Sequence, residues 1–320
     1  MQGAVQWSLA CVDAGSEFCP CYLGMTGECL VCSLLRGEDF CSCSWSGSCS
    51  YLNQRWSRGR IKERRKEEVE VEKEELTPGL ISFRLRLEQE LVRELNNPGS
   101  FLFLRPVGVP EAAALPVSVV DTEGREVWLV VVLAGPKTRL LSETDGKLVV
   151  HGPYYNGVLG LATLKSARAG TAVIVAGGVG QSTAVLVARQ LIRGGNRVKA
   201  CLAPGSAGRI YVAEKLRGLG VEVTEVKSMR TEGLPFLAQW LKEKPLVVFS
   251  GGPDSLHRAV MELVRKEDGD TELGCSQNSV ICCGDGLCGS CVDFLADGRR
   301  VPKCKAQYRI AKGGSHGWLK

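Results

Sequence analysis

The segment TAVIVAGGVGQSTAVLVARQLI, residues 171–192, joins an apolar run, a glycine-rich turn and a stretch of helical periodicity. The run at 172–176 predicts a buried strand, and residues 182–192 predict a helix that ends at Gly194. Between them stand Gly177, Gly178 and Gly180, where backbone amides and the helix dipole can hold a pyrophosphate. Taken alone, these glycines are equally well explained by tight packing of the strand against the helix.

Strands and helices continue to alternate up to residue 268. Strands are predicted at 198–202, 221–226 and 246–250, and helices near 209–219, 235–241 and 255–264. Such alternation is typical of a doubly wound parallel sheet, which we assign to residues 165–268. A second glycine turn, SGGPD at 250–254, follows the last of these strands. Because ligands of open sheets bind at the carboxyl ends of the strands, Gly252 and Pro253 are further candidates for binding a nucleotide.

A run of short strands precedes this sheet, over residues 67–160. The predicted strands lie at 69–71, 80–87, 101–104, 115–120, 126–132 and 147–150. Turn signals separate them, among them Asn97-Pro98-Gly99, Glu123-Gly124 and Asp145-Gly146. Short strands divided by turns at regular spacing indicate a small antiparallel barrel.

Four cysteines near the C-terminus have the spacing C-x4-C-x2-C-x12-C, in a segment that we place at residues 270–320. They are Cys283, Cys288, Cys291 and Cys304. This is the ligand spacing of a plant-type [2Fe-2S] centre, which moves single electrons. Glycines 284, 286 and 289 supply the tight turns that bring three thiolates together. The alternative is a structural zinc site, which usually has two separated CxxC-like pairs.

The remaining cysteines are concentrated at the N-terminus. Residues 1–56 contain eight of the fifteen: Cys11, Cys19, Cys21, Cys29, Cys32, Cys41, Cys43 and Cys49. So short a segment cannot build a large apolar core, and we expect a metal or a cluster to stabilise it. The spacing fits zinc or a [4Fe-4S] cluster, with a slight preference for iron. A loosely structured thiol-rich arm is a third interpretation, against which Trp45, Tyr51 and Trp56 argue as packing residues. We expect Cys201 and Cys275 to be buried as small hydrophobic residues, and Cys282 to be a bystander.

Composition and charge exclude several classes of protein. Of the 320 residues 44% are hydrophobic and 23% charged, and the longest apolar runs have the length of a strand, so no membrane span is expected. The N-terminus lacks the pattern of a secretory signal, and many cysteines without one indicate a reducing, cytoplasmic location. Three histidines far apart in the sequence argue against a Ser-His-Asp hydrolase.

The net charge of +5 is modest, and it is concentrated in one place. Seven Lys or Arg residues between Arg55 and Lys66 precede an acidic stretch at 67–75. We interpret the two together as a solvated linker of largely cancelling charge rather than a docking patch. A basic stripe carrying stacking aromatic residues is lacking, so nucleic acid is not an expected partner.

The order of these motifs resembles the ferredoxin-NADP reductase superfamily over residues 67–308. It is most similar to the electron-transfer subunit of dihydroorotate dehydrogenase, an enzyme of pyrimidine biosynthesis, and to the small subunits of sulfide dehydrogenase and ferredoxin:NADP oxidoreductase. The resemblance implies an antiparallel flavin barrel followed by a doubly wound parallel nucleotide-binding sheet. The [2Fe-2S] loop follows the sheet in the sequence, and the N-terminal cysteine-rich segment is additional to the family pattern. The implied cofactors are FAD, NAD(P) and a [2Fe-2S] cluster, besides a second cluster or zinc in the N-terminal segment.

The resemblance also implies the residues that hold the flavin. The family's Arg-Pro-x-Ser motif falls on residues 115–118, so Pro116 and Ser118 are kept while leucine replaces the arginine that meets the FAD phosphates. We expect Arg105 to substitute for it. Gly135 and Thr138 resemble the second flavin loop, and Gly152 the turn that closes the barrel.

The expected function is electron transfer between NAD(P)H, FAD and the cluster, to or from a catalytic partner subunit or ferredoxin. No residue is proposed for acid-base catalysis, because the cofactors perform the chemistry. Alternatives are a partner-independent ferredoxin or sulfide reductase and a flavin-free redox-sensing module, the latter motivated by Leu115. The segment after residue 202 lacks an acidic residue for a ribose hydroxyl, and Arg209 gives a weak preference for NADP.

Overall fold

A computed structural model describes residues 9–43, 45–294 and 298–310, and the chain divides into two compact units. The smaller unit comprises residues 1–65 and 279–309, and the larger unit residues 66–278 with 310–320. Both cysteine-rich segments therefore belong to the smaller unit. The C-terminal segment enters it at residue 279 rather than 270, because residues 272–276 form a strand of the parallel sheet.

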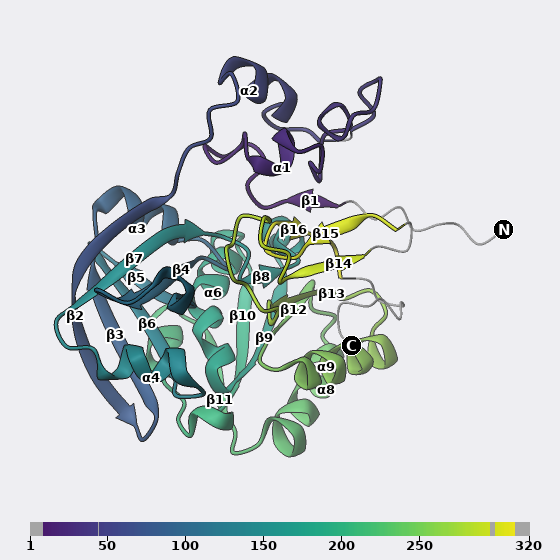
Figure 1. The fold of residues 1–320 in the computed structure, drawn as a ribbon. Helices are drawn as coiled ribbons and strands as arrows, with labels where there is room; N and C mark the ends of the chain where they lie inside the picture. The colour runs from purple at the N-terminus through teal and green to yellow at the C-terminus, as the bar shows by residue number, and fades with distance from the viewer. Residues whose placement is uncertain (1–8, 44, 295–297, 311–320) are drawn as a thin grey trace. The chain divides into compact units, whose positions relative to one another are not determined.

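Six strands of the larger unit close an antiparallel barrel in the order β2-β3-β6-β5-β4-β7 (Figure 1). These are β2 (Arg65–Thr77), β3 (Leu80–Arg86), β4 (Phe101–Pro106), β5 (Leu115–Glu123), β6 (Glu126–Val132) and β7 (Lys147–Tyr154). Alternate side chains point inward, and Phe83, Leu102 and Leu129 are almost completely buried in the barrel core. The barrel predicted from the short strands is confirmed.

The interpretation of the charged stretch as a linker is wrong from residue 65 onward. Strand β2 contains the whole acidic run, in which Val69 and Val71 pack on the barrel core while Glu68, Glu70 and Glu72 are exposed. The charges therefore form the solvent face of a strand with period two, which composition alone does not distinguish from a linker.

A six-stranded sheet of order β11-β10-β9-β12-β13-β8 forms the rest of the larger unit. The strands are β8 (Val158–Leu159), β9 (Thr171–Gly177), β10 (Arg197–Ala203), β11 (Glu222–Glu225), β12 (Val247–Gly251) and β13 (Glu272–Ser276). All neighbours are parallel except β8 and β13. Residues Val173, Ile174 and Phe249 are fully buried, as expected of strands covered on both faces. The doubly wound sheet is confirmed.

Helices accompany both parts of the larger unit (Figure 1). They are α3 (Gln89–Leu95), α4 (Pro136–Glu143), α5 (Leu161–Ser166), α6 (Ala184–Arg193), α7 (Ala213–Gly218), α8 (Leu234–Leu241) and α9 (Asp254–Glu267). The α-helix after the first glycine turn begins at residue 184 rather than 182, because residues 178–183 form a 3-10 helix. Helices α3, α4 and α5, of six to eight residues, were not predicted.

Helix α6 and the helix after β10 join the sheet to the barrel within this unit. Arg189 of α6 pairs with the buried carboxylate of Asp121 at 2.6 Å and donates to the backbone oxygen of Thr122 at 3.1 Å. Lys215 of α7 lies 3.3 Å from the other carboxylate oxygen of Asp121. Leu186 of α6 belongs to the barrel core. Barrel and sheet are thus held by both apolar packing and a partly buried ion pair.

The smaller unit has short elements and few large apolar side chains in its core. Strand β1 (Ala10–Cys11) pairs with β16 (Ala306–Gln307), and β14 (Val292–Phe294) pairs with β15 (Arg300–Pro302). Helices α1 (Tyr22–Met25) and α2 (Ser50–Trp56) complete it. Trp56 is 74% exposed, so its expected packing role is wrong, and Trp45 is 36% exposed. The aromatic residues therefore do not replace a core here.

Buried ions take up part of that interior. The carboxylate of Asp13 is 1% exposed and binds Arg64, at 2.7 Å, and Lys305. Both cations also contact Asp285, at 3.3 and 3.1 Å. The two carboxylates balance the two cations, so no net charge is buried.

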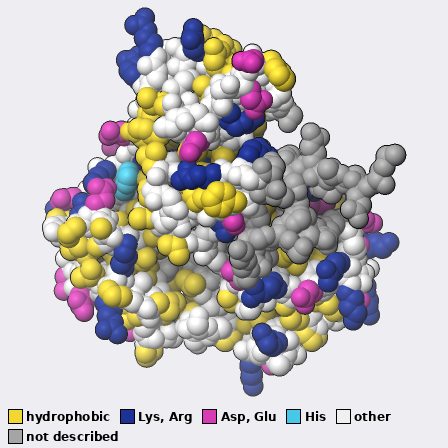
Figure 2. All heavy atoms as spheres, turned by 45° about the vertical axis from the view of Figure 1, so that its right-hand side comes forward, with side chains coloured by type: hydrophobic (Ala, Val, Ile, Leu, Met, Phe, Trp, Pro, Cys, Tyr) yellow, Lys and Arg dark blue, Asp and Glu magenta, His cyan; other side chains and the backbone are white. Residues whose placement is uncertain are grey.

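On the face shown in Figure 2, charged side chains of both signs are interspersed with apolar and uncharged ones. Among the described residues, no helix has both the length and the apolar character that a membrane crossing requires.

Candidate functional site

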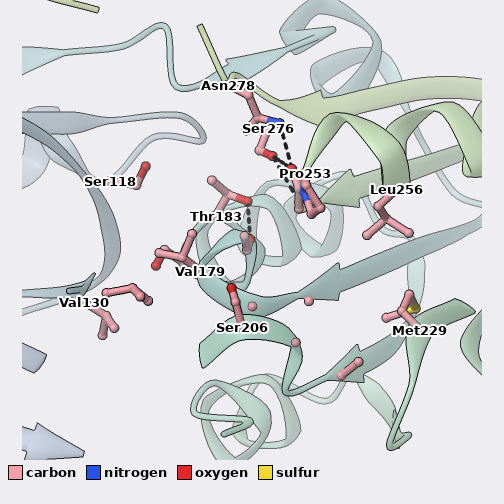
Figure 3. Close-up of a pocket in the computed structure, with 18 of the residues that line it drawn as sticks. Ser118, Val130, Val179, Thr183, Ser206, Met229, Pro253, Leu256, Ser276 and Asn278 are labelled. Carbon is pink, nitrogen blue, oxygen red and sulfur yellow. Dashed lines mark hydrogen bonds between the residues drawn. The ribbon is translucent and has the colours of Figure 1, made fainter. Parts of the chain in front are cut away.

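A cavity of about 760 Å³ lies in the larger unit, between the barrel and the carboxyl edge of the sheet (Figure 3). On the barrel side it is lined by Leu115, Pro116 and Ser118 of β5, by residues 130–132 of β6, and by Thr138 of α4. On the sheet side it is lined by the turns that follow β9, β10, β11 and β12. In Figure 3, Ser118 and Val130 lie on one side and Val179, Thr183 and Ser206 on the other. We call it the central cavity.

The two glycine turns meet backbone to backbone at this cavity. Strands β9 and β12 are paired so that Gly251 lies opposite Ala176, which brings both turns to the same edge. A Cβ atom on Gly180 would lie 2.3 Å from the carbonyl carbon of Gly251 and from the amide nitrogen of Gly252. Gly178 has a φ of +60°. The first turn therefore requires glycine at one position for space and at another for conformation.

Side chains from β13 and the loop after it hold the second glycine turn. Ser276 Oγ lies 3.2 Å from both the amide and the carbonyl oxygen of Gly252. Asn278 donates to the same carbonyl oxygen at 2.8 Å and to the Asp254 carboxylate at 2.7 Å. Figure 3 shows Ser276 and Asn278 pointing at the turn beside Pro253. The turn is thus fixed at the cavity wall by hydrogen bonds.

A buried histidine supports these contacts. His257 of α9 is 1% exposed, and its Nδ1 lies 2.8 Å from Ser250 Oγ. Its Nε2 lies 3.2 Å from Ser276 Oγ and 3.2 Å from Asn278 Nδ2. Burial lowers the pKa of His257 to about 4, so the imidazole is neutral at pH 7 and can both donate and accept. Sequence analysis missed this residue, because its partners come from separate elements.

Most of the predicted binding residues line the central cavity. They are Pro116, Ser118, Thr138, Gly177, Gly178, Gly180, Gly252 and Pro253. Arg105, Gly135 and Gly152 are not in its lining. Arg105 donates to the backbone oxygens of Val109, at 2.7 Å, and Pro106. Gly135 donates its amide to Thr138 Oγ1 at 3.0 Å and so helps to place that side chain. At Gly152 a Cβ atom would lie 2.5 Å from Leu102.

Two cationic residues in the lining were not predicted. Lys227 and Arg230 follow β11 and line the central cavity. The usable signal was their position directly after the strand predicted at 221–226. Arg209, which the sequence offered as a residue for the 2′-phosphate of NADP, instead donates to the backbone oxygen of Leu76 at 2.9 Å.

The four C-terminal cysteines come together in the smaller unit. Cys304 lies next to both Cys283 and Cys291, and hydrogen bonding with it is the first cause of their lowered pKa values. The Asp285 amide lies 3.4 Å from the Cys283 sulfur, and the Cys304 amide 3.3 Å from that of Cys291. The pKa of Cys283 is lowered to about 4, chiefly by the Cys304 hydrogen bond and also by backbone amides, and that of Cys291 to about 6. Gly284, Gly286 and Gly289 all have positive φ.

These thiols are close but not arranged around a single point. In the part of the chain that the structure describes, no three His, Cys, Asp or Glu side chains already form a metal-binding set. Cys201 and Cys275 are buried in the sheet, at 0% and 5% exposure, as expected of small hydrophobic residues. Cys282 is exposed.

The fold is that of the ferredoxin reductase-like proteins. A chain of the NADH-dependent reduced ferredoxin-NADP oxidoreductase superposes with a TM-score of 0.59 and 19% identity, over 77% of this chain and 87% of that one. An intact type IV self-sufficient cytochrome P450 monooxygenase superposes with a TM-score of 0.54 and 17% identity, over 76% of this chain and 40% of that one. These likenesses confirm the predicted fold.

Sequence comparison gives the family. No family model matches the chain. The protein of Methanopyrus kandleri named "Probable dihydroorotate dehydrogenase B (NAD(+)), electron transfer subunit" is 32% identical over 229 residues, which cover 69% of this chain and 82% of that protein. The corresponding subunit of Bacillus velezensis is 28% identical over 66% of this chain and 82% of that subunit. The chain belongs to the family of dihydroorotate dehydrogenase B electron transfer subunits, and the predicted class of electron-transfer oxidoreductase is confirmed.

Proposed function

We propose that this chain passes electrons between a nicotinamide nucleotide, FAD and a [2Fe-2S] cluster, and exchanges them with a catalytic partner subunit. The observation that carries the proposal is the central cavity, which is lined at once by the flavin-motif strand β5 and by two glycine turns of the nucleotide sheet. When bound, FAD would exchange a hydride with the nicotinamide and release its electrons singly to the iron-sulfur centre.

The barrel side of the cavity fits a flavin. Pro116 and Ser118 lie at the positions that the family motif gives to flavin contacts, and Val117 and residues 130–132 supply an apolar wall that keeps water from the reacting ring. Thr138 is held by the amides of Ala134 and Gly135, at 2.9 and 3.0 Å. Leu115, which stands where the family has an arginine, also lines the cavity and offers no positive charge to the FAD phosphates. The role of Arg105 in replacing it stays a prediction.

The sheet side fits a dinucleotide. Amides of the turn containing Gly177, Gly178 and Gly180 open the 3-10 helix before α6, where they can bind phosphate oxygens. Gly252 and Pro253 form the facing wall, fixed by Ser276 and Asn278. Lys227 and Arg230 bring positive charge to the same space, and we assign them to phosphate groups of the nucleotide.

The C-terminal cysteines fit the [2Fe-2S] centre. Their spacing has the plant-type order, their sulfurs are linked by hydrogen bonds, and backbone amides donate to the sulfurs of Cys283 and Cys291. Amides aimed at ligand sulfurs stabilise thiolates and tune the potential of such a centre. We therefore assign Cys283, Cys288, Cys291 and Cys304 as its ligands.

Spectroscopy of anaerobically purified protein tests this proposal. We expect a flavin absorbance that bleaches on adding NADH or NADPH, and a paramagnetic signal after reduction with dithionite. Cys288→Ser should remove the paramagnetic signal and leave the flavin, whereas Cys282→Ser, at the exposed neighbouring thiol, should keep both. A protein with the cluster signal but neither flavin nor bleaching would instead be the redox-sensing module that Leu115 motivates.

The partner is tested by co-purification of the native complex. Membership of the family favours a catalytic subunit to which this chain delivers electrons, and ferredoxin is the alternative. Isolation of the chain with a flavoprotein subunit that oxidises or reduces an organic substrate would support the first. Reduction of added ferredoxin by the isolated chain at a rate comparable to its NAD(P)H oxidation would favour the second.

A further inference from the structure

Two cysteine-bearing loops of the smaller unit are clamped together by hydrogen bonds. Ser33 is completely buried, and its hydroxyl donates to the Phe40 carbonyl oxygen at 3.0 Å and accepts from the Ser42 amide at 2.9 Å. Glu38 adds a second tie, because it pairs with Arg36 at 2.7 Å and accepts from the Ser42 hydroxyl at 3.1 Å. The loop at 29–33 is therefore fixed against the loop at 40–43.

Each loop carries two cysteines, in the order C-x2-C-x8-C-x-C. Cys29 and Cys32 are buried, at 7% and 4% exposure. Both precede Ser33, by four residues and by one. The Ser33 clamp thus holds together two loops that carry four cysteines within only fifteen residues, 29–43.

The sulfur separation in the second loop fits two ligands of a single ion better than two ligands of a cluster. The sulfurs of Cys41 and Cys43 lie 3.7 Å apart. With zinc–sulfur bonds of about 2.3 Å, two ligands of a tetrahedral zinc ion are separated by about 3.8 Å. In a [4Fe-4S] cluster the cysteine sulfurs bind different irons and stand further apart. The pair therefore has the spacing of one tetrahedral edge around a single ion.

The backbone around two of these sulfurs is already arranged for a metal. The amides of Val31 and Cys32, two and three residues further on, lie near the Cys29 sulfur. The Trp45 amide, also two residues further on, lies near the Cys43 sulfur. Such amides stabilise a metal-bound thiolate and orient it, as in the tight loops that hold structural metals. One sulfur of each loop has this support.

We propose that Cys29, Cys32, Cys41 and Cys43 form a mononuclear tetrathiolate site for a zinc ion, distinct from the iron-sulfur centre. Because the described side chains do not yet enclose a common point, binding would draw the first pair of thiols onto the second and release their protons to solvent. The free energy of binding would stabilise a unit whose interior holds few large apolar residues. The cysteine spacing left zinc and a [4Fe-4S] cluster open as alternatives, and the proposal favours zinc.

Metal analysis of the full chain, purified without oxygen, tests the site. We expect one zinc per chain in addition to the two irons of the cluster. Cys32→Ser and Cys41→Ser should each lose the zinc and keep iron and flavin, whereas Cys49→Ser, at an exposed thiol outside the four, should keep all three. Zinc well below one per chain in the wild type, or its equal loss in Cys49→Ser, would overturn the proposal.

Cobalt serves as a probe that needs no variant to fold. Protein produced with Co²⁺ in place of zinc should show the intense thiolate-to-metal charge-transfer bands and the visible bands of a tetrahedral tetrathiolate ion, and Cys41→Ser should weaken them. Spectra of an octahedral cobalt ion would refute the site. Failure here is separable from failure of the proposed function, because Cys288→Ser should lose iron and retain zinc.

Discussion

Replacing Gly180 by alanine tests the contact between the two glycine turns. The added methyl carbon would lie 2.3 Å from two backbone atoms, the carbonyl carbon of Gly251 and the amide nitrogen of Gly252. Ordinary contacts of this kind are about 3.5–4.0 Å, so the two turns would have to separate by more than an ångström. Neither partner is the end of a flexible side chain, and both belong to an edge pinned by Ser276 and Asn278.

The magnitude follows from that rigidity. Overpacking a well-packed region usually costs about 1–3 kcal/mol, and a clash with fixed backbone belongs at the upper end, about 3 kcal/mol. For a unit of this size, that cost lowers the melting temperature by roughly 6–12 °C. A displacement of about 1 Å at a nucleotide-binding turn should also weaken turnover with NAD(P)H by up to about 100-fold.

Two other glycines, one in the same turn and one in helix α7, provide matched controls. Gly177 is extended, with a φ of −145°, and its nearest neighbour to a Cβ would be 3.7 Å away. Gly218, at the end of α7, would meet nothing within 4 Å. Alanine at either should change the free energy of unfolding by less than about 1 kcal/mol. Urea unfolding followed by circular dichroism measures all three variants, and a Gly180→Ala protein as stable as Gly177→Ala would refute the reasoning.

Three further outcomes are expected. Burial holds the pKa of His257 at about 4, below its usual 6.5, so between these pH values the unfolded chain binds more protons than the folded chain. The free energy of unfolding of the larger unit should therefore fall as the pH drops from 6.5 to 4. His257→Gln should flatten that slope in unfolding experiments at several pH values, and an unchanged slope would contradict the expectation. Asp13→Ala leaves Arg64 and Lys305 with the Asp285 carboxylate alone, so one buried positive charge is no longer balanced, which should cost about 3–5 kcal/mol and raise hydrogen exchange in residues 9–43. Unaltered protection would argue against this expectation. Lys227→Ala should raise KM for the nicotinamide nucleotide about tenfold. The rise should be equal for NADH and NADPH if the lysine binds the pyrophosphate that both share, and confined to NADPH if it binds the 2′-phosphate. An unchanged KM for both nucleotides would remove the assignment of Lys227 to a phosphate group.

The fold was largely predictable because its strands are regular. Strands β9 and β12 are apolar runs that end in a glycine turn, and most barrel strands alternate, so these strands fall close to their predicted ranges. What escaped prediction lacked a local signal. Strand β13 was assigned to the cysteine segment, and its place in the sheet depends on pairing with β12, in which Ser250 lies opposite Cys275. Strand β2 was hidden by its charges.

The central cavity was predictable at its turns and less so elsewhere. A glycine turn between strand and helix has a local sequence pattern, and so Gly178 and Gly252 were found. The hydrogen bonds of His257 depend on Ser250 and Ser276, which adjoining strands bring together, and no spacing in the sequence encodes that meeting. Lys227 lies in the turn after a short edge strand and Arg230 in the five-residue π-helix Met229–Gly233, and neither segment is long enough to show a sequence period.

The pairing of β1 with β16 has a consequence for how the chain is made. Ala10 lies opposite Gln307, so the first strand emerges from the ribosome about 300 residues before its partner. At about 5–20 residues per second, it must wait roughly 15–60 s. Throughout that interval the early cysteines are present without the strand that completes their unit. Whatever shields them from oxidation and mispairing during synthesis must therefore be local, and an ion captured by the loops at 29–43 would be available within seconds of their emergence.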